Sequence, residues 1–481
     1  MQRFITQENK KWWTLGAVSV GLFVIMLDNT VVNVALPSIQ SSLHMTLPGL
    51  EWVVAGYALT FAAFMLTGGK LADLLGRRLI FMVGLAVFTG ASLACGLAPN
   101  GGFLIGARVV QGLGGALMNP ATLSIITATF PPRQRGMAIG IWAGVSAMAL
   151  AIGPLVGGLL TQHVNWNWIF FINVPIGVAA LFLIPVLVDE SRDTSADQRP
   201  DVPGLATSAV GLFALTYGFI EANHYGWTSG RIVGSFVVGA GALVVFALLE
   251  LRQRAPMLDL ALFRNRTFTG ANIAMLFVGL AMFGTFFYVS LYMQKVLLYS
   301  PVQAGASFLP MTVLIIVIAP QSGRLADRFG SRWLVGGGMA LLSIMLLYYS
   351  TLGANATFLG ILPGLLIGGT GMALTMTPTT AAAMSAVAVD KAGVGSAVLN
   401  SMRQVGGSLG IAVMGAIVAS GVNSSLRVGD GPRIAFLHGF HDALRVSSAL
   451  ALVGAIVATA AIRKQEHQHA APAAVHAAEA A

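Results

Sequence analysis

The stretch GKLADLLGRR at residues 69–78 has a second copy, GRLADRFGSR, at residues 323–332. Each copy lies between two apolar runs, and the apolar runs near 13–36 and 269–293 precede the copies at about the same distance. A pattern that recurs at matching places indicates an internal repeat. The sequence therefore predicts two related halves, each built from six apolar segments around a central cavity.

The composition decides the class of protein. Of 481 residues, 56% are hydrophobic and 9% are charged, and the mean hydropathy is +0.79, whereas an average soluble domain is about 25% charged. This predicts an integral membrane protein. The formal charge of +9 comes from basic residues in the breaks between apolar runs, so we expect no nucleic-acid partner. The single cysteine, Cys95, excludes an intrachain disulfide, and we expect no metal site.

Fourteen apolar segments are long enough to cross a bilayer, which takes roughly 20 residues. The first six lie near 13–36, 50–69, 79–98, 102–128, 136–160 and 166–188. A middle pair and six more follow near 203–221, 231–250, 269–293, 303–322, 332–352, 357–379, 394–420 and 442–462. We predict an all-α fold with these parts: an N-terminal six-helix bundle (13–188), a cytoplasmic linker with two inserted helices (189–265), a C-terminal six-helix bundle (266–463) and a disordered cytoplasmic tail (464–481).

Lysine and arginine residues predict the orientation. Most of the 27 fall at the termini and in the even-numbered gaps, few fall in the odd-numbered gaps, and Arg108 and Arg403 fall inside spans. Cytoplasmic loops carry the excess of basic residues. We therefore predict that both termini are cytoplasmic, which requires an even number of spans, and expect a multi-pass monomer in the inner membrane of a bacterial cell.

The repeated stretch also predicts a moving part. An aspartate beside a helix end can pair with an arginine, or with the positive end of a neighbouring helix, in one conformation and release it in another. The alternative is that the basic residues only set the topology, but the same pattern in both halves favours a role in motion. We predict a conformational latch made of Gly69, Asp73, Gly76, Arg77 and Asp327.

The repeated stretch resembles the major facilitator superfamily signature G-x-L-A-D-x-x-G-R-[KR], and the span number resembles the fourteen-span drug:proton antiporter branch. Residues 27–37 (LDNTVVNVALP), 104–114 (LIGARVVQGLG) and 166–177 (WNWIFFINVPIG) are similar to further signatures of that branch. The fifth span matches its antiporter motif at Gly140, Gly153, Pro154, Gly157 and Gly158, with Ala149 where the branch has glycine.

This resemblance implies the major facilitator fold, two six-helix bundles plus two inserted helices. It also implies proton-coupled export of hydrophobic or cationic small molecules by alternating access, as in multidrug efflux and antibiotic resistance. The proton gradient would be the energy source, with no cofactor. The glycines of the fifth span and residues 406–410 of the thirteenth allow close helix packing and form an interhelix hinge, although packing alone explains them equally well.

Two charged residues inside spans carry the chemistry. Asp28 lies at the centre of the first span and Arg108 lies in the fourth. A charge at mid-membrane costs at least about 2.5 to 3.5 kcal/mol, so it faces a bundle interior or a wet cavity and finds a partner. Asp28 can carry a proton whereas Arg108 stays charged. We predict that protonation of Asp28 releases Arg108, and that ionised Asp28 pairs with Arg108 or with a cationic cargo; a purely structural ion pair is the alternative.

Other polar and aromatic residues are weaker candidates. Glu221, at the outer end of the seventh span, is a second protonatable site or a solvated rim residue, and Arg403 has no partner that the sequence identifies. The ninth span is rich in Met and aromatic residues, which suit hydrophobic ligands and cation-π contacts but also lipid. The predicted substrate-cavity residues are Asn33, Phe283, Phe287 and Tyr288.

Three classes of function compete. The first is a proton-coupled exporter of many small molecules, and the second is a transporter of the same fold with one physiological cargo such as a lipid, a metabolite or a siderophore. The third, a membrane enzyme, is disfavoured because the chain contains no H-E-x-x-H or G-x-x-x-x-G-K-[ST] motif. We therefore predict a transporter and no catalytic residues.

Overall fold

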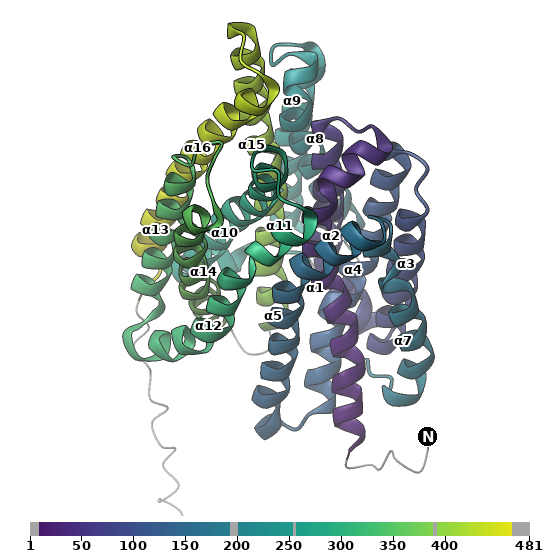
Figure 1. The fold of residues 1–481 in the computed structure, drawn as a ribbon. Coiled ribbons are helices and arrows are strands. Elements are labelled where there is room, and N and C mark those ends of the chain that lie inside the picture. The colour runs from purple at the N-terminus through teal and green to yellow at the C-terminus, as the bar shows by residue number, and fades with distance from the viewer. Residues whose placement is uncertain (1–8, 193–200, 254–255, 388–391, 464–481) are drawn as a thin grey trace, which may run out of the picture.

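The computed structural model describes residues 9–192, 201–253, 256–387 and 392–463 (Figure 1). The first half consists of α1 (Lys10–Leu43), α2 (Leu47–Leu75), α3 (Arg77–Gly96), α4 (Gly101–Thr129), α5 (Pro132–His163), and a short α6 (Trp168–Phe171) that leads into α7 (Asn173–Leu187). The inserted pair is α8 (Val202–Tyr225) and α9 (Gly230–Arg252).

The second half begins with the 3-10 turn η1 (Leu260–Arg264). It continues with α10 (Arg266–Leu291), which runs into a π-helical turn, η2 (Tyr292–Val296), and with α11 (Pro301–Ser307), α12 (Leu309–Phe329), α13 (Ser331–Tyr349), α14 (Phe358–Ser385), α15 (Ala392–Val428) and α16 (Pro432–Ala461). Within the described residues, fourteen helical segments are long and apolar enough to cross a membrane. The predicted all-α architecture with fourteen spans is confirmed.

The repeated stretch is helical over most of its length, which differs from the predicted interhelix gap. Helix α2 continues through Asp73 to Leu75, and only Gly76, with φ of 124°, turns the chain into α3. In the second half Gly330, with φ of 84°, separates α12 from α13 in the same way. Residues with a Cβ rarely adopt such angles, so glycine permits a one-residue turn. The apolar run ends before the helix does. Polar side chains at a membrane surface lower the hydropathy, but they leave the backbone hydrogen bonds of the helix in place.

The fourteen crossings bring the start of α1 and the end of α16 to one end of the bundle, here called the terminal end (Figure 1). At the other end, the opposite end, hydrogen bonds join the two halves: Ser290 Oγ donates to Asn33 O (2.9 Å), Gln294 Nε2 to Val34 O (3.0 Å) and Lys295 Nζ to Gln40 Oε1 (2.5 Å). We call these six residues the opposite gate. In this structure the gate is closed.

Glycines on α5 and α11 let the halves touch at the backbone. A Cβ at Gly158 would lie 2.5 Å from the carbonyl oxygen of Pro301, and a Cβ at Gly305 would overlap the carbonyl oxygen of Pro154. Cβ atoms do not approach carbonyl oxygens so closely, so larger residues would separate these helices. The antiporter-motif residue Pro154 therefore lies in the contact between the halves.

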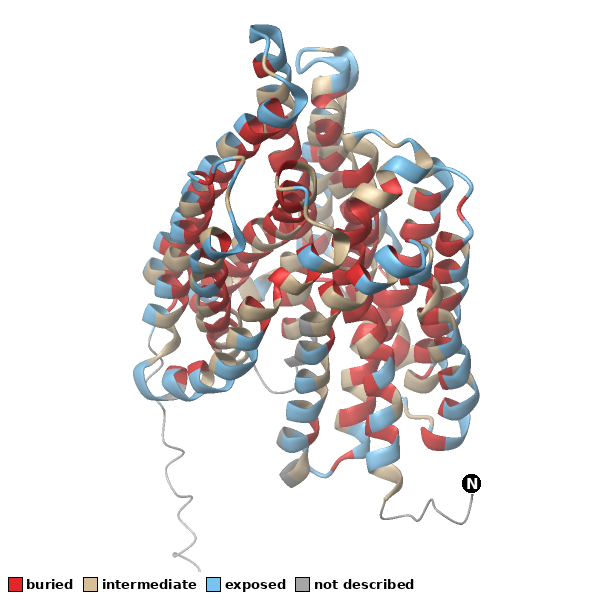
Figure 2. Ribbon diagram, viewed as in Figure 1, coloured by how far each residue is buried: buried red, intermediate tan, exposed pale blue. Residues whose placement is uncertain are grey.

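The buried residues concentrate where helices meet, and the exposed apolar residues lie on outer helix faces (Figure 2). Helix α9 is the clearest case, since Val237, Val244 and Leu251 are each more than half exposed. Exposed apolar side chains on a spanning helix face lipid. Helix α8 lies between α9 and the two halves, and it packs against α2 of the first half and α15 of the second. The inserted pair therefore covers a line of contact between the halves.

Candidate functional site

Asp28 of α1 and Arg108 of α4 form a buried ion pair. Arg108 Nη1 lies 2.5 Å from Asp28 Oδ2, and the two residues are 1% and 0% exposed. The other carboxylate oxygen, Oδ1, accepts hydrogen bonds from Gln111 Nε2 (2.9 Å) and from Asn173 Nδ2 (3.3 Å). The structure thus brings together the two residues that the sequence singled out, and surrounds the carboxylate with donors that suit its ionised form.

Arg108 is held on several sides as well. Its Nε donates to the carbonyl oxygen of Val53 (3.0 Å), and Nη1 also donates to Gln111 Oε1 (2.6 Å). The guanidinium carbon lies 4.3 Å from the ring centroid of Tyr57 and 5.7 Å from that of Phe170, within cation-π range. Helices α1, α2, α4, α6 and α7 all contribute to this cluster, so a change of charge at Asp28 alters contacts among five helices.

Two polar atoms beside the ion pair have no hydrogen-bond partner among the residues that the structure describes. They are the hydroxyl of Tyr57 and the Oδ1 atom of Asn173, both buried. A buried polar atom without a hydrogen bond costs about 1 to 3 kcal/mol, and such atoms often mark a site that changes state. The cluster therefore contains one donor and one acceptor that are available for new hydrogen bonds.

The predicted latch lies at the terminal end. Asp73 Oδ1 accepts a hydrogen bond from Arg77 Nε (2.9 Å), and it also forms an ion pair with Arg77 Nη2 at 2.9 Å. Gly69 faces Pro120 of α4, and Gly76 leaves space for the Glu190 carboxylate, which accepts the backbone N–H groups at the start of α3. The side chain of Asp327 lies outside the described part of the structure. Asp73 and Arg77 are thus paired with each other inside the first half.

The substrate-cavity candidates are buried in the protein, not in contact with lipid. Phe283, Phe287 and Tyr288 are at most 8% exposed. Asn33 is buried too, and its carbonyl oxygen belongs to the opposite gate. In this conformation, two of the four candidates, Asn33 and Tyr288, contribute to contacts between the halves.

Glu221 does not join the Asp28 cluster. It lies half-buried on α8, where its charge acts on a second buried carboxylate, Glu51 of α2. Glu51 is 2% exposed, and its Oε1 atom accepts a hydrogen bond of 2.8 Å from the hydroxyl of Tyr288 on α10. A carboxylate of the first half thus contacts a tyrosine of the second. Arg403 of α15 is half-buried, and its Nε atom has no hydrogen-bond partner among the described residues.

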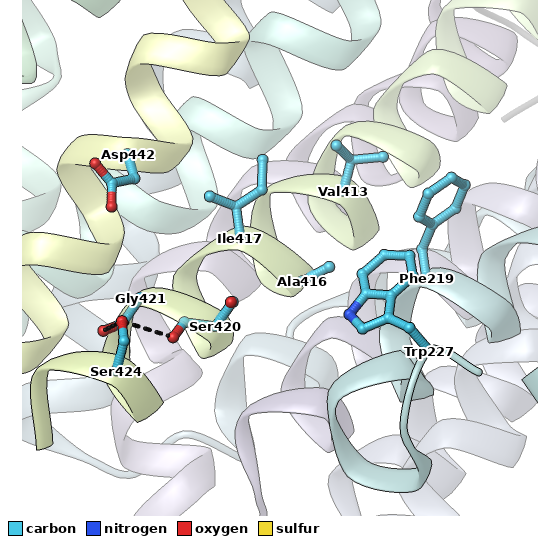
Figure 3. A pocket seen from close by; sticks show the side chains of 9 residues that line it. All are labelled: Phe219, Trp227, Val413, Ala416, Ile417, Ser420, Gly421, Ser424 and Asp442. Carbon is cyan, nitrogen blue, oxygen red and sulfur yellow. Dashed lines mark hydrogen bonds between the residues drawn. The ribbon is translucent and has the colours of Figure 1, made fainter. Parts of the chain in front are cut away.

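A cavity of about 410 Å³ opens near the opposite end, between α8 and the helices α15 and α16. Figure 3 shows Phe219 and Trp227 together on one wall and Asp442 across from them. Residues Val413, Ala416, Ile417, Ser420, Gly421 and Ser424 complete the lining. The cavity does not include Asp28 or Arg108, so it is separate from the ion-pair cluster.

The sequence matches the Major Facilitator Superfamily profile over residues 18–411. The chain belongs to this superfamily. Its relatives include the tetracenomycin C resistance and export protein of Streptomyces glaucescens, 40% identical over 88% of this chain and 77% of that protein. The multidrug resistance protein Stp of Mycobacterium tuberculosis is 37% identical over 86% of this chain and 77% of that protein. The puromycin resistance protein pur8 of Streptomyces alboniger is 36% identical over 93% of this chain and 91% of that protein.

Solved structures agree on the fold. A bacterial homolog of the human lysosomal transporter Spinster, in an inward-facing and unoccupied conformation, aligns with a TM-score of 0.68 at 17% identity, over 96% of this chain and 100% of that one. The relatives support the predicted branch, and this superfamily member is a transporter of the bacterial inner membrane rather than an enzyme.

Sequence reasoning missed several residues of this transporter's site. Gln111 and Asn173 both donate hydrogen bonds to Asp28. Gln111 lies in the quoted stretch 104–114 and Asn173 in the stretch 166–177. Their polarity inside apolar segments was a usable signal, as polar residues at membrane depth face the interior of the bundle. Glu51 gave a weaker signal, because it stands at the start of its span, where a charge is common.

Proposed function

We propose that the transporter is a proton-coupled antiporter that exports hydrophobic or cationic small molecules by alternating access. The observation that carries the proposal is the Asp28–Arg108 pair, buried at the centre of the first half. A titratable residue at membrane depth is a functional residue by default. The proton gradient supplies the energy, no cofactor takes part, and the working unit is a monomer.

Protonation of Asp28 would rearrange the cluster in a defined way. A neutral carboxyl group no longer holds Arg108, and its O–H needs an acceptor. The free Oδ1 atom of Asn173 can supply that acceptor if the amide group rotates by half a turn. Arg108 then keeps the Val53 carbonyl and the Tyr57 ring as partners. The Asp28 carboxyl group therefore has hydrogen-bond partners in both of its protonation states.

The two states would be linked to movement of the halves. Asp28 lies on α1, whose outer part also carries the gate residues Asn33, Val34 and Gln40. Helix α1 is continuous from Lys10 to Leu43, so a shift at Asp28 is transmitted along it to the opposite gate. By the charge rule the terminal end faces the cytoplasm, and the structure then represents the state whose outer gate is closed.

The relatives support export of drug-like cargo. One of them is named for export of tetracenomycin C and another for resistance to puromycin. The second candidate, a transporter of one physiological lipid, metabolite or siderophore, differs in breadth of cargo. A panel of unrelated cations and neutral drugs, tested for efflux by cells that make the protein, separates the two. Broad efflux supports the first function, and efflux of one compound supports the second.

The proposal is tested by uphill transport in inside-out vesicles with an imposed pH gradient. We expect the wild type to accumulate cargo only with the gradient, and Asp28→Asn to accumulate none. The matched control is Asp189→Asn, which removes a surface carboxylate whose side chain is 80% exposed, and it should accumulate cargo like the wild type. Full accumulation by Asp28→Asn would contradict the proposal.

A further inference from the structure

The contact between Glu51 and Tyr288 joins the two halves of the transporter in its interior. Glu51 lies near the start of α2, and Tyr288, which follows it by 237 residues, lies in α10 and is fully buried. The tyrosine hydroxyl donates to Glu51 Oε1 over 2.8 Å. The second carboxyl oxygen, Oε2, is buried and has no hydrogen-bond partner within the described part of the chain.

Helix α15 closes the site with a glycine. A Cβ added to Gly415 would overlap the carboxyl group of Glu51, so the carboxyl packs directly against the backbone of α15. Both α10 and α15 belong to the second half, while Glu51 belongs to the first. The carboxyl group is therefore enclosed by the other half, and it stays enclosed only while the halves are in contact.

The charged groups around Glu51 do not neutralise it. Helix α8 contributes the like-charged Glu221, α10 contributes the neutral Tyr288 and α15 contributes Gly415. From α4, Arg108 reaches the α2 backbone at Val53, but its charge is paired with Asp28. From α9, Arg231 stacks over the Tyr217 and Tyr225 rings of α8, at 5.4 and 4.1 Å.

A buried carboxyl with one neutral donor and a like-charged neighbour is stable only in its protonated form. A carboxylate removed from water is strongly destabilised when no cation compensates its charge. A proton removes the charge and the repulsion from Glu221 at once. The enclosed site of Glu51 therefore fits the neutral, protonated carboxyl group.

Glu51 also lies close to a route for water. Its neighbour Trp52 packs in one apolar cluster with Ala55, Phe219 and Ala412. Phe219 lines the cavity of Figure 3, which opens near the opposite end. Separation of α2 from α15 would remove Gly415 from the carboxyl group and connect it to this water-accessible space.

We propose that Glu51 is a proton-operated lock on the opposite gate, protonated when the gate is closed and ionised when it opens. Closing the gate then takes up one proton and opening it releases one. The closed state is favoured at low pH, and this preference is lost as the pH rises. One linked proton changes the ratio of closed to open molecules by at most about tenfold per pH unit.

The lock rests on the proposed function only in assuming that the halves alternate. It differs from coupling at Asp28, because its proton enters and leaves on the same side of the membrane. The gate is therefore measured at equal pH on both sides, without cargo. A transporter driven by some other ion would still show the lock, and a lock that failed would leave proton-driven accumulation intact.

The test is a distance distribution across the opposite end, measured by spin-label spectroscopy in lipid nanodiscs from pH 5 to 9. The labels are attached through Ser42→Cys in the first half and Asn355→Cys in the second, both exposed positions, while the native Cys95 is buried. We expect the labelled wild type to shift from short to long distances as the pH rises. A distribution that does not change with pH would overturn the proposal.

Substitutions test whether Glu51 itself causes the change of distance with pH. Glu51→Gln mimics the protonated form, so we expect short distances at every pH. Tyr288→Phe keeps the carboxyl but removes a hydrogen bond that exists only while the halves are in contact. It therefore weakens the closed state, and the midpoint should move to lower pH. Glu221→Gln is the control for the neighbouring carboxylate, and the distances in this variant should still lengthen as the pH rises. An unchanged response in Glu51→Gln, or a response abolished by Glu221→Gln, would overturn the proposal.

Discussion

Asp28 and Glu51 are both buried carboxylates of the first half, but their surroundings are opposite. Asp28 has a cation 2.5 Å away and accepts hydrogen bonds from two amide side chains. Glu51 has one neutral donor, one oxygen without a partner and a like-charged neighbour. The first environment suits an ionised group, and the second suits a protonated one.

The two sites also differ in what holds them together. All described partners of Asp28 belong to the first half, so its environment moves as a unit with that half. The partners Tyr288 and Gly415 of Glu51 belong to the second half, so its environment exists only while the opposite end is closed. We therefore assign the coupling of protons to cargo to Asp28, and the proton that controls the gate to Glu51.

The largest expected loss of stability comes from removing the cation beside Asp28, which leaves this carboxylate without a charged partner, as Glu51 is. Arg108→Ala removes the cation and leaves a buried carboxylate uncompensated, which costs about 3 to 5 kcal/mol in free energy of unfolding. The measurement is thermal unfolding in detergent. The double variant with Asp28→Asn should recover part of the loss, since no charge is then left alone. A double variant less stable than Arg108→Ala would contradict the assignment of an ionised Asp28.

A smaller effect should follow from crowding Glu51. Gly415→Ala places a methyl group where the Glu51 carboxyl lies, and such overpacking costs about 1 to 3 kcal/mol. Because the crowding exists only when the halves are in contact, we expect longer distances across the opposite end. The control is Gly90→Ala in α3, since a Cβ at Gly90 meets no atom within 4 Å. Equal distances in Gly415→Ala and the wild type would show that Glu51 does not depend on α15.

The smallest effect on stability is expected at a third carboxylate, Asp73. Its pair with Arg77 is an i,i+4 contact near the terminal end, and such pairs contribute about 0.3 to 0.5 kcal/mol. Asp73→Asn should therefore unfold like the wild type but transport cargo several times more slowly, because the predicted latch acts in another conformation. The measurement is the initial rate of efflux per molecule of protein. Wild-type rates would reduce the repeated stretch to a topology signal.

The fold and the ion pair could be predicted because their signals are local. Fourteen apolar segments, a repeated stretch and two charges inside spans are visible in short windows of the sequence. The pairing of Asp28 with Arg108 followed from the cost of isolated charges in a membrane. The helical state of residues 69–75 was missed because hydropathy, not helix formation, defined the predicted gap.

Glu51 could not be predicted in the same way. Its partner Tyr288 is 237 residues away in the other half, and no pattern near either residue indicates the contact. Tyr288 was grouped with the aromatic residues suited to a cavity, because a tyrosine at membrane depth gives the same signal in either role. The contact depends on how the halves meet, which is a property of one conformation rather than of any segment.

The measurement that tests the central claim most directly is proton movement driven by cargo. Proteoliposomes that contain a pH-sensitive dye receive a cargo gradient and no pH gradient. We predict that downhill cargo movement changes the internal pH with the wild type but not with Asp28→Asn, even where cargo exchange persists in that variant. A pH change of wild-type size per cargo molecule with Asp28→Asn would contradict the claim that Asp28 couples protons to transport.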